Sequence, residues 1–233
     1  MNAPRTLILA IALLLAGLLP ATVAASADAG GEPASPEEVV NEVVTEALQT
    51  IAEERETLAT DRAAGVELFN DQVLPWVDTD LMARFAMGPA ARQADPAEIE
   101  RLRAALTNRV ANLYAGALQR YAEEAADFAE EGEVSLRTVS EDDKRAIVSA
   151  RVRGPHVDDL TLRIQLYKRD DRWRVFDIET SGVSILLVFR DALQAASHGG
   201  DVDAMIAALE EGSVNVEEAW EEETGDAADA ADS

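Results

Sequence analysis

Few side chains in this sequence of 233 residues are of the types that carry out covalent chemistry. It contains no cysteine, which excludes thiol catalysis and thiolate metal sites. His156 follows a Gly-Pro turn and His198 precedes a Gly-Gly pair, so we interpret both as solvated loop residues rather than as metal ligands or bases. The sequence has no Gly-rich phosphate loop, serine elbow or calcium-loop spacing. We therefore expect no metal, no cofactor and no catalytic residue.

Asp177 and Tyr114 are the two residues for which a role in proton transfer can be considered. A carboxylate and a tyrosine serve in this way in cone-shaped enzymes of the ketosteroid-isomerase type. A structural role is favoured for both. We expect Asp177 to bond to backbone or to an arginine from a strand, and the hydroxyl of Tyr114 to lie at the mouth of a cavity. A small-molecule enzyme or binding protein of this cone fold remains the alternative function.

The charge of the chain limits the partners that it can hold. There are 45 acidic and 20 basic side chains, and the formal net charge is −25. Nucleic acids and anionic membrane surfaces would repel such a chain, so we expect neither as a tightly bound partner. Hydrophobic residues make up 48% of the sequence and aromatic residues only 5%, which predicts an aliphatic core of one-domain size.

Both ends of the chain predict segments that lie outside this domain. Residues 1–25 have a single charge at Arg5 and an apolar run of 13 residues from Leu7 to Leu19, followed by small residues, as in a secretory signal peptide. The run is shorter than the roughly 20 residues that span a bilayer. Residues 26–34 are predicted to be a flexible leader and residues 212–233 a disordered acidic tail. Residues 35–211 remain as the folded part of an exported, soluble protein.

Helical periodicity dominates the first part of this domain. Ser35 and Pro36 are a typical helix start, and apolar residues follow at helical spacing as far as Ile51. Further helices are predicted over residues 61–73, 78–87, 95–126, 183–197 and 201–209. Alanine recurs along the helix at 95–126, either because alanine favours helices or because small side chains leave room for a ligand.

The period then changes to two, which is typical of strands. Strands are predicted over residues 134–139, 146–153, 160–169 and 173–180. The short connections, among them Asp170-Asp171, imply an antiparallel meander. In the third strand the apolar residues Leu160 and Leu162 alternate with Thr161 and Arg163. One face of the sheet is therefore exposed to solvent, and the other must be covered by the helices. The fold class is therefore α+β, with helices on one face of a four-stranded antiparallel meander sheet.

Two blocks of sequence resemble a known family. Residues 173–178 (WRVFDI) with Gly182-Val183-Ser184 are similar to one signature of the MlaC-type periplasmic phospholipid carriers, also called toluene-tolerance auxiliary components. Residues 73–75 (VLP) with Asp78, residues 82–84 (MAR) and Gly88 are similar to a second. The two blocks have the family's order and spacing, and the resemblance spans about Val39 to Leu209. The chain departs from the pattern at Ala91, where an aromatic residue is common, and at Ser181, where glutamate is common.

The resemblance implies a soluble carrier without enzymatic activity, monomeric and located in the periplasm. It would bind a glycerophospholipid by its acyl chains and shuttle it between an outer-membrane lipoprotein complex and an inner-membrane ABC transporter with an MCE-domain subunit. Two acyl chains hold about 30 methylene groups, and burying them in a bilayer is favourable by about 24 kcal/mol. The carrier must provide a similar free energy of burial, which requires an enclosed apolar cavity between helices and sheet. The headgroup can stay in water. From the apolar faces of these segments we predict that the cavity is lined by Met82, Phe85, Val110, Leu113, Tyr114, Leu166, Val175 and Val183.

Overall fold

The computed structural model describes residues 35–197 and 200–214. The predicted signal peptide and leader, nearly all of the predicted tail and His198 lie outside the described residues. The described helices are α2 (Pro36–Glu53), α3 (Arg55–Thr60), α4 (Arg62–Leu68), α5 (Thr79–Met87), α6 (Pro96–Arg120), α7 (Ala122–Glu131), α8 (Ile185–Ala196) and α9 (Val202–Glu210). None of these helices is long and apolar enough to cross a membrane.

The strands form one antiparallel sheet in sequence order, and the predicted α+β meander is confirmed. Its strands are β1 (Glu133–Glu141), β2 (Arg145–Gly154), β3 (Val157–Arg169), β4 (Arg172–Thr180) and the short β5 (Val183–Ser184). The fifth strand was not predicted. Ser181 and Gly182 both have positive φ and turn the chain back, so that Val183 pairs with Thr180 before α8 begins at Ile185.

The turn between β3 and β4 has the backbone of a tight hairpin. Asp170 and Asp171 have φ values of 50° and 60°. Two positive φ values are what a primed hairpin turn requires, and aspartate tolerates this region better than most residues. The hairpin predicted at Asp170-Asp171 is therefore present.

Side-chain caps fix the starts of the two longest helices. Ser35 and Glu38 form a reciprocal capping box at α2, and Asp95 and Glu98 form one at α6. The helix predicted over residues 95–126 is divided, because Tyr121 leaves the helical region with φ −122° and ψ 29°. The bend turns α7 toward the sheet and places the ring of Phe128 in the core, where it is fully buried.

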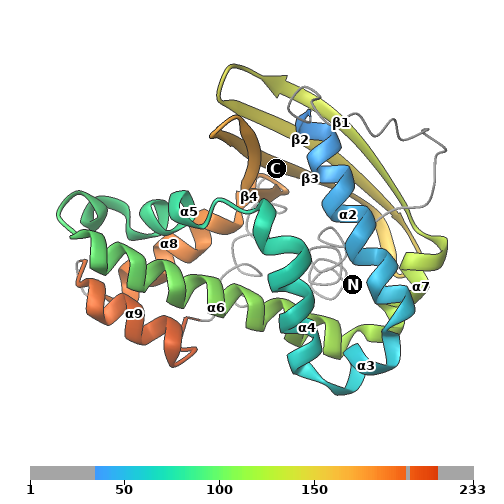
Figure 1. The fold of residues 1–233 in the computed structure, drawn as a ribbon, viewed down its shortest axis with the longest axis horizontal. Coiled ribbons are helices and arrows are strands. Elements are labelled where there is room, and N and C mark those ends of the chain that lie inside the picture. The colour runs from blue at the N-terminus through green and yellow to red at the C-terminus, as the bar shows by residue number, and fades with distance from the viewer. Residues whose placement is uncertain (1–34, 198–199, 215–233) are drawn as a thin grey trace, which may run out of the picture.

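Two apolar clusters form the interior, and α6 passes through both. One cluster lies between the sheet and α2, α4 and α7, and the other joins α5, α8, α9 and the first half of α6. In Figure 1 the second group of helices forms a lobe beside the sheet, and α6 runs from this lobe toward α7. Val110 and Ile185 pack against both clusters. The boundary between the two clusters, called the seam below, thus crosses α6 at Val110.

The alanines of α6 allow helices to approach one another. A Cβ added at Gly65 of α4 would lie 2.9 Å from the Cβ of Ala115. Such a contact is possible only because both side chains are minimal. The hypothesis that the alanines leave room for a ligand is not needed to explain this position, where the partner is another helix.

Candidate functional site

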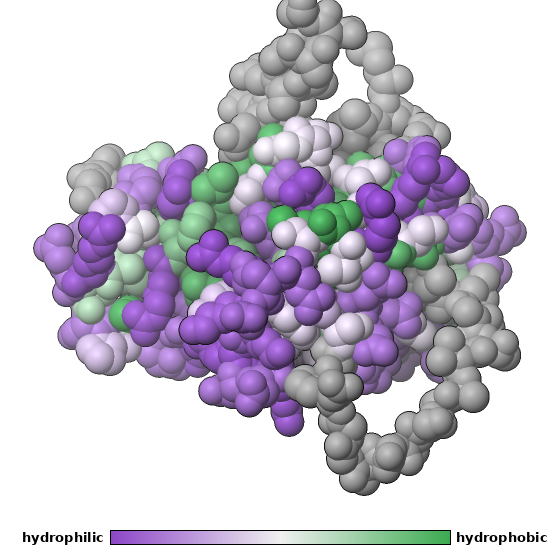
Figure 2. All heavy atoms as spheres, turned by 90° about the horizontal axis from the view of Figure 1, so that it is seen from above, coloured by the Kyte–Doolittle hydropathy of each residue, from purple (hydrophilic) through white to green (hydrophobic). Residues whose placement is uncertain are grey.

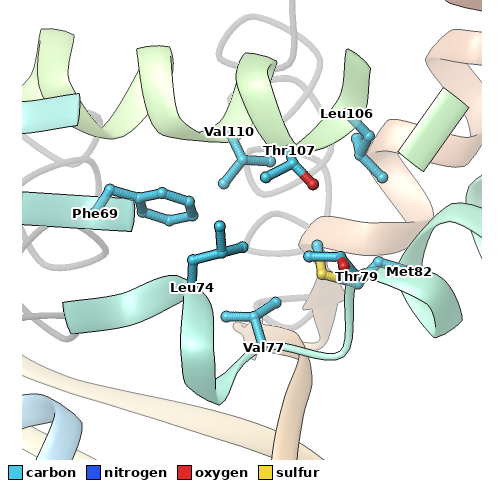
Figure 3. Close-up of a pocket in the computed structure, with 8 residues that line it drawn as sticks. All are labelled: Phe69, Leu74, Val77, Thr79, Met82, Leu106, Thr107 and Val110. Atoms are coloured by element: carbon cyan, nitrogen blue, oxygen red, sulfur yellow. The ribbon is translucent and has the colours of Figure 1, made fainter. Parts of the chain in front are cut away.

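An apolar pocket lies at the seam between the two clusters. Its volume is about 10 Å³, which is room for about one water molecule, and it is partly open to solvent. As Figure 3 shows, its wall is built by Phe69, Leu74, Val77, Thr79, Met82, Leu106, Thr107 and Val110. Phe69, Leu74 and Val77 belong to the cluster under the sheet and Met82 and Leu106 to the other, so both cores contribute to the wall.

One side of the pocket is made of irregular backbone. Phe69 begins a π-helical turn (η1, Phe69–Val73), and Leu74 begins a 3-10 turn (η2, Leu74–Trp76) that contains Pro75. Proline cannot continue an α-helix, and π-turns occur frequently at functional sites. Val77 then forms an isolated bridge with Val175 of β4, which ties this segment to the sheet.

The structure distributes the eight residues that we predicted for the cavity wall over several environments. Met82 and Val110 line the pocket, from α5 and α6. Tyr114, Leu166 and Val175 belong to the cluster under the sheet, while Leu113 and Val183 belong to the cluster of α5, α8 and α9. Phe85 is 40% exposed and packs under the guanidinium of Arg190.

The remaining wall residues were within reach of sequence reasoning only in part. Phe69 and Leu106 lie on the apolar stripes of the predicted helices, and Leu74 is part of the motif at 73–75. Periodicity shows that these side chains are buried, but it does not show which of them lie at the seam between two cores. Thr79 and Thr107 gave no signal, because a polar residue on a helix is normally solvated.

Charged side chains surround the end of the pocket at Thr79. Arg84 Nε and Arg169 Nη1 each lie 3.1 Å from Oδ2 of Asp80. Burial opposes the ionisation of Asp80, but the hydrogen bonds and the positive charges of these two arginines together outweigh it and lower the pKa of Asp80. Arg103 Nη1 donates to Thr79 Oγ1 at 3.3 Å, so this ionic group reaches the pocket wall.

Asp78 holds this corner of the fold together. One carboxylate oxygen accepts from Leu81 N at 3.0 Å and caps α5, while the backbone N–H of Asp78 donates to Val175 O of β4 at 2.8 Å. The second oxygen is buried 3.0 Å from Arg169 Nε, although the N–H is not aligned for a hydrogen bond. The pocket rim is therefore anchored to the sheet through the backbone N–H of Asp78 and through the ion pair of its carboxylate with Arg169 of β3.

Asp177 has a structural role in this geometry. Ser184 Oγ donates to Asp177 Oδ2 at 2.6 Å and Gln165 Nε2 donates to the same oxygen at 3.1 Å. Leu186 N donates to Oδ1 at 3.1 Å, so Asp177 helps to cap α8. Burial raises the pKa of Asp177 above its ordinary value, and the hydrogen bonds partly offset the rise. A carboxylate whose oxygens are both occupied by protein donors is poorly placed to act as a general base.

Tyr114 lies deeper than we expected from the sequence. Its side chain is buried against the ring of Phe69, with ring centroids 5.6 Å apart. The hydroxyl is also buried and has no hydrogen-bond partner within the described residues, so the expected position at a cavity mouth is wrong. Burial raises the pKa of Tyr114 well above its ordinary value. The pair of Asp177 and Tyr114 therefore gives the cone-fold enzyme alternative no support.

Metal ligands do not gather in the part of the chain that the structure describes. No group of three or more His, Cys, Asp or Glu side chains there could hold a metal ion. His156 lies in the turn before β3, where its Nε2 is 3.1 Å from Oδ2 of Asp127, and both side chains are exposed. This agrees with the interpretation of His156 as a solvated loop residue.

Comparison with known protein families identifies the family of this chain. The family model described as "MlaC protein" matches residues 41–211, which is most of the chain. The chain belongs to the MlaC family. The resemblance seen in the two sequence blocks is thereby confirmed, and it extends over most of the described residues.

A solved structure has the same fold as this MlaC protein. It is the phospholipid-binding protein from Ralstonia solanacearum, determined in complex with a phospholipid. The TM-score is 0.61 at 20% sequence identity, and the alignment covers 72% of this chain and 91% of that chain. No match was found among curated proteins.

Proposed function

We propose that this protein is a periplasmic carrier that binds a glycerophospholipid by its acyl chains and shuttles it between outer- and inner-membrane complexes. The observation that carries the proposal is the apolar pocket at the seam of two hydrophobic cores in an MlaC fold. The solved relative, described as phospholipid-binding, adds support because it shares this fold. The protein acts by binding and release, without covalent chemistry.

One face of the molecule offers acyl chains little continuous apolar surface. On the face shown in Figure 2, hydrophilic side chains dominate, and hydrophobic ones form separate patches between them. Acyl chains bound on such a face would remain largely in water. In a bilayer the burial of each methylene is favourable by roughly 0.8 kcal/mol, and binding on this face would not provide a comparable free energy. Binding on this face is therefore unfavourable, which favours the pocket as the site for the acyl chains.

The pocket must widen to admit a lipid. Its volume of about 10 Å³ is far below the roughly 300 to 1,000 Å³ of sites for drug-sized ligands. Widening is possible here because the wall at Phe69 and Leu74 belongs to short irregular turns, and because separate cores lie on the two sides. Opening the seam exposes the facing apolar walls of both cores to the acyl chains, while each core keeps its own packing.

The proposed partners follow from the proposed role. They are an outer-membrane lipoprotein complex and an inner-membrane ABC transporter with an MCE-domain subunit, with the monomeric carrier moving between them in the periplasm. Residues 1–25 would be the export signal and residues 26–34 and 212–233 would flank the folded domain, as the sequence predicts.

Transfer of lipid between vesicles tests this role. Donor vesicles containing a self-quenched fluorescent phosphatidylethanolamine are mixed with unlabelled acceptor vesicles, and dequenching reports transfer. We expect the initial rate to rise in proportion to the concentration of the protein, as it does for a diffusing carrier. A rate that equals the spontaneous rate at all protein concentrations would contradict the proposal. The alternative function as a small-molecule enzyme would then need a substrate search.

A further inference from the structure

The hydroxyl of Tyr114 is a buried donor to which the described residues offer no acceptor. The side chain is 5% exposed and belongs to the apolar cluster under the sheet. A buried polar group without a partner costs a protein free energy, and most such groups in native structures are hydrogen-bonded. Burial also raises the pKa of Tyr114, so the hydroxyl keeps its proton and is able to donate it.

Tyr114 lies next to residues that line the pocket. Val110, a wall residue, is four positions before Tyr114 on α6, so the two side chains share one face of the helix, about 6 Å apart along its axis. The ring of Phe69, another wall residue, is 5.6 Å from the ring of Tyr114. Figure 3 shows the ring of Phe69 at the opposite end of the pocket from Leu106. An extension of the pocket along α6, past Val110 and Phe69, therefore leads to Tyr114.

Phe69 is placed where the backbone is adjustable. It is the first residue of the π-helical turn η1, which separates the end of α4 at Leu68 from the 3-10 turn η2. The pocket has room for about one water molecule, so wall residues must move before an acyl chain can enter. A movement of the Phe69 ring away from Tyr114 lengthens the pocket and gives a ligand access to the buried hydroxyl.

We propose that the lipid site extends past Phe69 and that the hydroxyl of Tyr114 donates a hydrogen bond to an ester carbonyl oxygen of the bound lipid. The inference rests on the proposed function and deepens it. The methylene groups of an acyl chain hold no acceptor, so the carbonyl at the head of the chain is the acceptor that enters an apolar site with it. The phosphate takes no part in this contact and can stay in water. Lipids with ester-linked chains are therefore preferred over lipids with ether-linked chains, which have no carbonyl.

Tyr114→Phe tests this contact, with Tyr121→Phe as the matched control. Tyr121 follows the last turn of α6 and packs, partly buried, against the same cluster, so each variant removes one tyrosine hydroxyl and no charge. The delipidated protein, expressed from its full sequence, is titrated with dioleoylphosphatidylcholine and with the diether analogue that has the same headgroup and chain length. We expect Tyr114→Phe to weaken the diester lipid by about 3- to 10-fold, as for one lost hydrogen bond, and to leave the diether lipid unchanged. Tyr121→Phe should change neither affinity.

Two further measurements separate a ligand contact from a structural role of the hydroxyl. Because the hydroxyl has no acceptor among the described residues, lipid-free Tyr114→Phe should melt at the same temperature as the wild type or at a higher one. Infrared spectra of bound diester lipid, isotope-labelled at its ester carbonyls, report the contact directly. The wild type should show a carbonyl band at lowered frequency, and this band should be absent from the complex of Tyr114→Phe.

Three results would overturn the contact. They are equal weakening of both lipids by Tyr114→Phe, an unchanged affinity of this variant for the diester lipid, and a carbonyl band that is the same in both complexes. A lipid-free variant that melts well below the wild type would also overturn it, because the hydroxyl would then have a partner within the protein. If the unsubstituted protein binds neither lipid, the proposed carrier function itself fails.

Discussion

Val110→Trp is expected to remove most lipid binding while leaving the fold intact. Val110 lines the pocket and packs against both apolar clusters, so an indole ring at this position occupies space that an acyl chain needs. If the ring takes the place of about three methylenes, about 2.4 kcal/mol of burial is lost, and affinity falls about 50-fold. Lipid extracted from the purified variant and quantified against protein gives the measurement.

Val183→Trp is the matched control for this experiment. Val183 is 8% exposed and belongs to the cluster of α5, α8 and α9, but it is not among the residues that line the pocket. A ring forced into a filled core costs about 1 to 3 kcal/mol, so this variant should melt at a lower temperature and keep its lipid. If Val110→Trp is instead strongly destabilised and still binds lipid, the ligand does not lie beside Val110.

Asp177→Ala is expected to lower the free energy of unfolding by about 2 to 4 kcal/mol, because it leaves the buried N–H of Leu186 and the side chains of Ser184 and Gln165 without their acceptor. Asp177→Asn keeps an acceptor for Leu186 and should lose about 1 kcal/mol or less at neutral pH. Urea unfolding measures both. Asp191→Ala on α8 is the control, since the ion pair of Asp191 with Arg190 is exposed and its loss should cost less than about 0.5 kcal/mol.

The stability difference between the wild type and Asp177→Asn should also depend on pH. Because the pKa of Asp177 is raised in the folded protein, the native state binds this proton more readily than the unfolded chain does. The wild type should therefore gain stability relative to Asp177→Asn as pH falls through the folded pKa, and the gain should be complete below the ordinary value of 3.8. A constant difference between the two proteins from neutral pH to below that value would contradict the assignment of a raised pKa.

The fold could be predicted from the sequence where local signals are strong. Ser35 and Asp95 mark helix starts because their caps are local, and the alternation around Leu162 marks a strand because its two faces meet different environments. The bend at Tyr121 and the strand at Val183 were not predicted. The bend goes with the burial of Phe128 in the core, which depends on distant parts of the chain. The strand at Val183 depends on the two positive φ values at Ser181 and Gly182, which periodicity does not reveal.

The site was predicted less completely than the fold, for a physical reason. Met82 and Val110 were chosen from apolar faces, and the pocket includes them, but the same criterion also selected Leu166, which is fully buried under the sheet. An apolar residue on the inner face of a helix or strand is predicted to be buried. The sequence does not indicate whether protein or ligand atoms cover it. Thr79 and Thr107 carry the opposite pattern, and only the three-dimensional structure shows that these two polar residues lie in the wall of an apolar pocket.

We propose that one glycerophospholipid occupies the seam between the two cores. Native mass spectrometry of the protein, purified from the periplasm of an expressing bacterium without detergent, tests it most directly. The account predicts one dominant species with the mass of the mature chain plus one diacyl glycerophospholipid, and fragments of the released ligand should identify its acyl chains. Repeated preparations that show only the mass of the bare chain, and that take up no phospholipid from vesicles, would contradict it.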